Sequence, residues 1–176
     1  MDIPSVTKTR AEVAEGFIQI ETLVGRIITD SYFGQNNPMS LLFMLEMLYD
    51  EHCTFAMKRS VLRKVLDPLF QESETRKKTK IEFEKLYRLN SVRNIFAHCG
   101  PDVVLAKDGK GMCFIPDPRN PSKRLDLESA LKDFKRLEPE VFQWLLDLLP
   151  KVTRAREQAV SRFGVRMQNN LPHEEK

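Results

Sequence analysis

The stretch KIEFEKLYRLNSVRNIFAHC, residues 80–99, decides the fold class, because its apolar residues recur at helical spacing. On a helical wheel the apolar side chains share one arc: Phe83, Leu86, Leu89, Phe96 and Ala97. The side chains on the opposite, solvent-facing arc are Glu84, Lys85, Arg88 and Ser91. Gly100-Pro101 follows and ends the helix. The stretch therefore predicts an amphipathic helix that covers an apolar core.

The chain before this stretch shows the same helical periodicity. A long amphipathic helix is predicted from about Thr9 to Thr29, and the polar residues 34–38 form a loop after it. Leu41–Tyr49 is dense in Leu and Met and predicts a buried helix. Its amphipathic continuation, Phe55–Leu69, has a break or kink near Pro68.

The chain after residue 70 contains one interruption of the helical pattern. Residues 72–80 are polar and are predicted as a loop or as the exposed start of the helix that ends at Cys99. Two β-prone runs, 103–105 and 112–115, flank Asp108-Gly109-Lys110-Gly111 and predict a small hairpin. From Leu125 the helical period returns, restarts after Glu138-Pro139 and continues past Pro150 toward Phe163.

These elements predict an all-α fold, an up-and-down bundle of four to six helices with a small β-hairpin insertion near residues 103–115. Residues 1–8 are interpreted as an N-terminal extension, 9–166 as one helical domain and 167–176 as a polar, disordered tail. No repeat or second domain is predicted.

The composition of the 176 residues excludes several classes of protein. Apolar residues make up 41% and charged residues 30%, and seven glycines are few for a Gly-rich nucleotide-binding fold. No signal peptide is recognised at the start, and the longest apolar run, 41–48, is too short to cross a bilayer. We therefore expect a cytoplasmic protein with no membrane partner. The net charge of +3 permits RNA binding without demanding it.

The histidines and cysteines do not form a recognisable metal motif. The three cysteines are expected to be reduced. Two follow histidines, as His52-Cys53 and His98-Cys99, but adjacent side chains on a helix point about 100° apart and chelate poorly. The chain also lacks a phosphate-binding glycine loop and paired metal carboxylates. We expect no metal and no cofactor.

Polar residues within the apolar arc of residues 80–99 are the candidate site. Arg93 falls between Leu86 and Leu89, and Asn90 falls beside Phe83. A buried Arg needs a partner or a wet interface. Asn94 and His98, four residues apart, share a stripe at the edge of the arc.

A purely structural role for the same residues is the alternative interpretation. Arg93 can pair with a core carboxylate such as Glu21 or Glu46. His98 can simply favour the negative end of the helix dipole.

The longer string Leu89–His98, with its Arg93-Asn94-Ile95-Phe96-Ala97-His98 run, resembles the signature of the HEPN family of small helical proteins. The resemblance implies a metal-independent ribonuclease that acts as a homodimer, with the signature helices of two subunits facing each other. It implies that Arg93 and His98 are the catalytic pair and that Asn94 orients them or holds phosphate. We also expect Asn90 to contact the substrate. A weaker resemblance is to the mannitol-repressor-like members of the family. Some toxins of the family carry a Tyr two residues after the His, where this chain has Gly100.

The chemistry of these residue types agrees with RNA cleavage. Attack of a 2′-hydroxyl on the neighbouring phosphate needs a base, an acid and stabilisation of charge on the phosphorane. Histidine serves as acid or base, and arginine binds phosphoryl oxygens. One signature supplies only one His, so acid and base together favour two signatures in one dimeric site. His52 is the alternative second proton-transfer group.

Two functions follow as hypotheses. The first is an endoribonuclease of the toxin or phage-defence kind, cleaving RNA at a composite site and silenced by a possible antitoxin. The second is a non-catalytic regulatory or transcriptional-regulator module that binds a protein partner, although no helix-turn-helix reader is recognisable.

Overall fold

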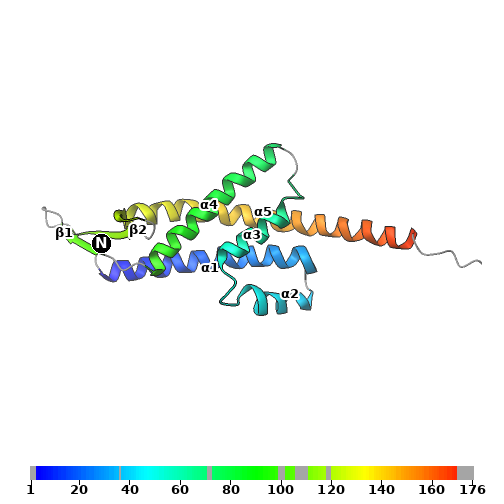
Figure 1. Ribbon diagram of the computed structural model, residues 1–176, viewed down its shortest axis with the longest axis horizontal. Helices are drawn as coiled ribbons and strands as arrows, with labels where there is room; N and C mark the ends of the chain where they lie inside the picture. The colour runs from blue at the N-terminus through cyan, green and yellow to red at the C-terminus, as the bar shows by residue number, and fades with distance from the viewer. Residues whose placement is uncertain are drawn as a thin grey trace, which may run out of the picture. The chain divides into compact units, whose positions relative to one another are not determined.

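The computed structural model describes residues 3–35, 37–70, 73–98, 102–105, 111–117 and 120–169. For residues 3–6, 73, 98, 102–105, 111–117, 120–125 and 163–169 it describes the backbone alone. The protein is mostly helical, as the sequence predicted (Figure 1). Among the described residues no helix is both long enough and apolar enough to pass through a lipid bilayer.

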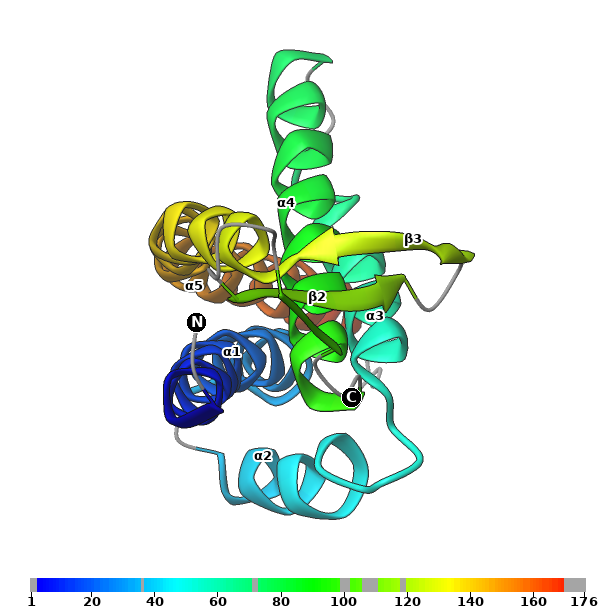
Figure 2. The same cartoon turned by 90° about the vertical axis from the view of Figure 1, so that its left-hand side faces the viewer.

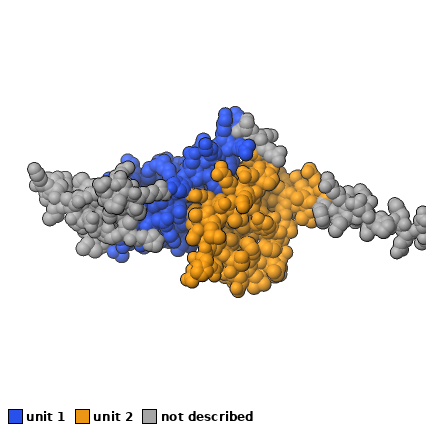
Figure 3. All heavy atoms as spheres, in the orientation of Figure 1, with its two compact units in different colours: residues 1–23, 72–144 blue, residues 24–71, 145–176 orange. Residues whose placement is uncertain are grey.

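The chain forms two compact units, shown in different colours in Figure 3. Unit 1 comprises residues 1–23 and 72–144, and unit 2 comprises residues 24–71 and 145–176. The first and last helices pass through both: α1 is Ile3–Phe33 and α5 is Leu127–Asn169. Each unit therefore contains one part of α1 and one part of α5, together with elements of its own.

Unit 1 adds α4, Ser73–His98, to the first part of α1 and the first part of α5. The apolar side chains that these helices bury are Val13, Phe17, Ile20, Leu86, Leu89, Ile95, Phe96, Leu127, Phe134, Leu137 and Val141. Between α4 and α5 the rings of Phe83 and Trp144 meet edge to face, 5.7 Å between centroids. Residues 72–80, predicted as loop or helix start, belong to α4 from Ser73 onward.

Three antiparallel strands lie between α4 and α5: β1 Asp102–Leu105, β2 Gly111–Asp117 and β3 Asn120–Asp126. Their order is β1-β2-β3, with Val103 opposite Cys113 and Ile115 opposite Leu125; Figure 2 shows β2 beside β3. The sequence prediction did not include the third strand. Its residues include Pro121 and two charges and lack the apolar alternation by which a strand is recognised. Residues 106–110, part of the predicted hairpin, lie outside the described residues.

Unit 2 contains α2, Pro38–Phe43, a π-helical turn η1, Met44–Leu48, and α3, Phe55–Leu66. Asn37 and Thr54 cap α2 and α3 through their side chains, and α3 ends directly before the turn that contains Pro68. The apolar side chains buried in this unit are Val24, Ile27, Ile28, Leu48, Phe55, Leu62, Leu66, Leu145, Leu148 and Val152.

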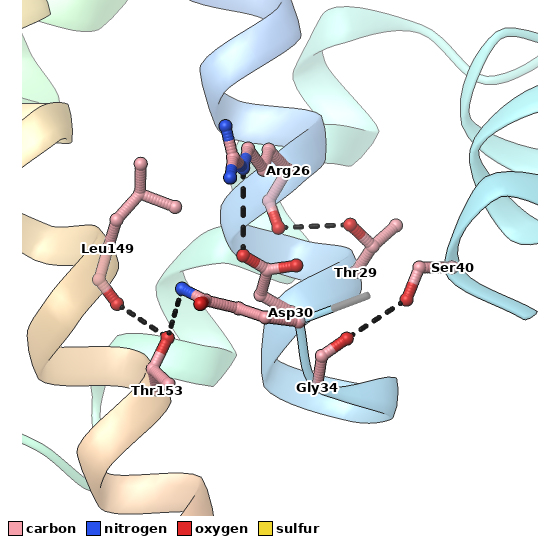
Figure 4. A network of polar contacts seen from close by, with 8 residues as sticks. Arg26, Thr29, Asp30, Gly34, Ser40, Leu149 and Thr153 are labelled. Atoms are coloured by element: carbon pink, nitrogen blue, oxygen red, sulfur yellow. Dashed lines mark hydrogen bonds and ion pairs between the residues drawn. The ribbon is translucent and has the colours of Figure 1, made fainter. Parts of the chain in front are cut away.

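A polar network surrounds the end of α1 in unit 2 (Figure 4). Asp30, which is buried, has its Oδ2 3.8 Å from Arg26 Nε, and the Gly34 amide donates to the Asp30 carbonyl. The Ser40 hydroxyl donates to the Gly34 carbonyl. Thr153 of α5 donates to Leu149 O and accepts a hydrogen bond from Gln35. These contacts connect α1, the start of α2 and α5.

Three predictions about helices need correction. The Leu41–Tyr49 region is helical, but it is not buried, because only Leu48 among residues 38–48 is buried. Ala97, predicted on the apolar arc of α4, is exposed. The helix does not restart at Glu138-Pro139: α5 is continuous through Pro139 and Pro150.

The ends of the outer helices also extend beyond their predicted ranges. The missing proline hydrogen bonds in α5 are compensated by burial of neighbouring residues Leu137, Val141 and Val152. The helix extends to Asn169, so residues 167–169 of the predicted tail are helical. Residues 170–176 lie outside the described residues. α1 begins at Ile3, within the predicted extension.

Candidate functional site

The candidate site lies at the C-terminal end of α4 in unit 1, where this helix lies beside α1 (Figures 1 and 2). Leu86 and Leu89 are fully buried, and Ile95 and Phe96 are buried one and two turns further on. These apolar residues hold α4 against the unit core. Burial of their side chains determines which polar residues of the same helix end at the edge of that core.

Arg93 is half-buried and lies over the face of Phe17, with its Cζ 5.6 Å from the ring centroid. Phe17 belongs to α1 and is only 1% exposed. Arg93 Nη1 also donates a 3.0 Å hydrogen bond to Asn94 Oδ1. An aromatic face and an amide oxygen together orient the guanidinium without neutralising its charge.

Other cations of α4 have different surroundings. Arg88 forms an ion pair with Asp133 of α5 at 2.7 Å. Lys85 contacts both Glu82 and Glu140 at 2.8 Å, and the hydrogen bonds from these two carboxylates raise the pKa of Lys85. The contacts described for Arg93 include no carboxylate. Arg93 therefore keeps a charge that is available to an anion.

The proposed partners Glu21 and Glu46 are thus not among the contacts described for Arg93. Glu21 is half-buried on α1 and takes part in another interaction. Glu46 is exposed and belongs to unit 2. The structural alternative, a core ion pair at Arg93, has no support among the described contacts.

Asn90 and Asn94 are both half-buried, as expected for polar residues at the edge of an apolar face. The amide of Asn94 accepts the hydrogen bond from Arg93, so its oxygen orients the guanidinium. Asn90 lies one turn before Asn94 on the same helix. The structure thus brings Arg93 and Asn94 into contact and places Asn90 on the adjoining turn.

His98 is the last residue of α4, and its side chain lies outside the described residues. The backbone nevertheless determines where the residue begins. On an α-helix, positions 94 and 98 are separated by about 40° around the axis and about 6 Å along it. Positions 93 and 98 are separated by about 140° and about 7.5 Å. His98 therefore shares a stripe with Asn94, and Arg93 is on the neighbouring part of the helix surface.

His52, the alternative proton-transfer group, lies in unit 2 in the segment between η1 and α3. Its side chain is exposed, with Nε2 3.7 Å from Glu51 Oε1. Its backbone amide donates to the Asp50 carboxylate. The role assigned to His52 stays a prediction.

A separate cavity of about 190 Å³ lies between α1 and α5 in unit 1, and none of the predicted site residues lines it. Its polar residues are Glu12, Lys135 and Glu138. Lys135 forms an ion pair with Glu12, and burial raises the pKa of Glu138. Within the described part of the chain, no three His, Cys, Asp or Glu residues are grouped so that they could hold a metal ion.

Phe17 is the site residue that the sequence did not identify. In the sequence it is one of several apolar residues that recur along the first helix, and nothing in that periodicity associates it with a residue 76 positions later. The contact exists because α1 and α4 pack together. Only the fact that Arg93 occupies an apolar arc predicted that some core side chain would adjoin it.

No protein-family model, no curated protein and no solved structure matches this chain.

Proposed function

We propose that this chain is a HEPN-like, metal-independent endoribonuclease of the toxin or phage-defence kind, which cleaves RNA at a composite site shared by two subunits. Arg93 and His98 are its catalytic residues, and Asn94 and Asn90 contact the substrate. The observation that carries the proposal is the half-buried guanidinium of Arg93, held by Phe17 and Asn94 with no carboxylate among its described contacts.

This arrangement suits a phosphate ligand. A guanidinium whose charge is not neutralised by the protein binds phosphoryl oxygens with charge-assisted hydrogen bonds. Because Arg93 is already oriented, little reorganisation is needed when charge develops on the phosphorane. Its neighbour Asn94 has a side-chain amide that both donates and accepts hydrogen bonds.

Proton transfer is assigned to His98. An imidazole with an ordinary pKa near about 6.5 acts as base toward the 2′-hydroxyl or as acid toward the leaving 5′-oxygen. Each subunit contributes one such residue, so a two-fold dimer supplies both roles in one site. The 2′-oxygen forms the new bond to phosphorus as the bond to the 5′-oxygen breaks, giving a 2′,3′-cyclic phosphate and a 5′-hydroxyl.

The test is cleavage of total RNA by the purified protein in excess EDTA. Arg93→Ala and His98→Ala are each expected to lower the rate by about a hundredfold or more, the range for loss of a charge-stabilising or proton-transferring group. Arg88→Ala, which removes an exposed cation from the same helix, is the matched control and should retain the rate.

Two outcomes would overturn the proposal. One is absence of cleavage by the wild-type protein under these conditions. The other is cleavage that survives both Arg93→Ala and His98→Ala. A protein partner that co-purifies in fixed proportion, with no cleavage of RNA, would instead favour the non-catalytic regulatory module.

A further inference from the structure

The outward surface of α2 and η1 is apolar. On the inward side the rings of Phe43 and Phe33 lie 5.3 Å apart, and Leu48 is 4% exposed. The outward side carries five exposed apolar residues, with Leu41 61% and Leu45 55% exposed. We call this surface the outward apolar face; its members are Met39, Leu41, Leu42, Leu45 and Met47.

A helix on a protein surface normally turns polar residues to water, and a contiguous exposed apolar patch marks an interaction site. α2 follows neither half of that pattern, because it has no buried residue and few polar ones. η1 is a π-helical turn, a form that recurs at functional positions. Two of the five residues are methionines, whose flexible thioethers adapt to the shape of a bound partner.

The surroundings of this face carry negative charge only. Glu46, Asp50 and Glu51 are exposed, and there is no Lys or Arg between residues 38 and 57, so the segment has three negative charges and no positive ones. An acidic border repels an anionic membrane surface. It attracts an apolar surface flanked by cations.

The C-terminal part of α5, also in unit 2, has this complementary character. α5 continues past the end of α1 (Figure 1), and residues 157–162 are all exposed, with Val160 56% exposed. Residues 151–162 contain four Lys or Arg and one Glu, a net charge of 4 − 1 = +3. Val152, Ala155, Ala159 and Phe163 recur at three- and four-residue steps in the sequence and define an apolar stripe.

We propose that residues 151–169 of α5 from a second copy of this chain bind across the outward apolar face, with their cations beside Glu46, Asp50 and Glu51. Within one chain both surfaces are exposed, so neither covers the other. Each copy has one face and one α5 end, and a two-fold arrangement satisfies both at once. The proposal concerns unit 2 and does not depend on the nuclease site.

The first experiment measures binding of a fluorescein-labelled peptide of residues 151–169 to the full chain by fluorescence anisotropy. We expect saturable binding that Leu45→Glu weakens about tenfold or more, because a charge is then placed in the apolar contact. Ile81→Glu, at a 52% exposed apolar position of α4, is the matched control and should bind like wild type. A peptide with Arg154→Glu and Arg162→Glu should also bind about tenfold more weakly.

The second experiment locates the contact directly. A photoreactive benzoylphenylalanine at position 45 is crosslinked in an equal mixture of ¹⁵N-labelled and unlabelled chains, and the adduct is mapped by mass spectrometry. We expect mixed-isotope adducts within residues 151–169.

The proposal is overturned by absence of saturable peptide binding, by equal effects of Leu45→Glu and Ile81→Glu, or by adducts that lie elsewhere or within one chain. Binding of the wild-type protein, but not Leu45→Glu, to neutral phosphatidylcholine vesicles without peptide binding would assign the face to lipid.

Discussion

Arg93 shows how a single residue can work against stability. Removing a guanidinium from water has a free-energy cost that an ion pair with a carboxylate can offset. Lys85 and Arg88 on the same helix have such partners, whereas Arg93 contacts an aromatic ring and an amide. Residues that bind a ligand often reduce stability in its absence, and Arg93 fits that description.

Arg93→Met is therefore expected to change the free energy of unfolding by less than about 1 kcal/mol, since methionine fills the space and the lost contacts are offset by desolvation no longer required. Phe17→Ala, by contrast, removes a buried ring and should cost about 3–5 kcal/mol. Urea denaturation of both variants measures this difference. A large loss of stability in Arg93→Met would assign Arg93 a structural role.

Asp30 provides a test at the level of one proton. Burial raises the pKa of Asp30, although the Arg26 charge acts in the opposite direction. A carboxyl whose pKa is raised by folding contributes stability that is present below its unfolded pKa and lost as the pH rises through the folded pKa. Asp30→Asn stays neutral, so we expect it to be more stable than wild type at pH 7. The gain should disappear below the ordinary aspartate pKa of 3.8.

Asp133 is the control with the opposite sign. Burial raises the pKa of Asp133, but hydrogen bonds and charge from Arg136 and Arg88 outweigh burial and lower it overall. Asp133→Asn should therefore be less stable than wild type at pH 7 and converge with it at low pH. Thermal denaturation between pH 3 and pH 7 tests both variants. Equal pH profiles for Asp30→Asn and wild type would contradict the assignment.

At the scale of elements, the turn between α1 and α2 depends on one backbone conformation. Gly34 has φ +85°, and a Cβ there would lie 2.6 Å from Arg156 Nη1. Gly25, in the middle of α1, has helical backbone, and a Cβ there would meet Leu48 at an ordinary 3.7 Å. The two glycines therefore respond in opposite ways to the same substitution.

Gly34→Ala is expected to destabilise the protein by about 1–2 kcal/mol, because alanine disfavours positive φ and must displace Arg156. Gly25→Ala should stabilise it by about 0.5–1 kcal/mol, since alanine favours a helix interior. Chemical denaturation gives both values. Equal shifts in one direction would contradict the described turn.

The elements also show what local sequence cannot determine. Periodicity correctly predicted α1, α3 and α4, because each buries one stripe in its own unit. It wrongly predicted a buried helix at Leu41–Tyr49, because an apolar run has the same composition whether a core or another molecule covers it. It wrongly placed a break at Pro139, because packing on both sides retains the helix despite the lost hydrogen bond.

At the scale of the whole molecule, the proposed nuclease requires two subunits. A wild-type chain mixed with a ninefold excess of the inactive Arg93→Ala/His98→Ala variant is expected, after subunit exchange, to lose activity by about tenfold, because most wild-type chains then pair with an inactive chain. The rate of cleavage at saturating RNA measures this effect.

The control is the same mixture assayed before exchange occurs, which should keep the activity of the wild-type chains present. Undiminished activity after full exchange would show that one subunit contains the whole site. In that case His52 is the group to test as the second proton-transfer residue.

The sequence alone determined that the protein is mostly helical and that Arg93, Asn90 and Asn94 border a buried face, because helical periodicity depends only on the order of residues. Only the tertiary structure decided that Phe17 lies under Arg93, that carboxylates of α5 pair with Lys85 and Arg88 but not, among the described contacts, with Arg93, and that α2 keeps its leucines exposed. Such contacts join residues far apart in the chain. They arise when helices pack, and local spacing carries no record of which surfaces meet.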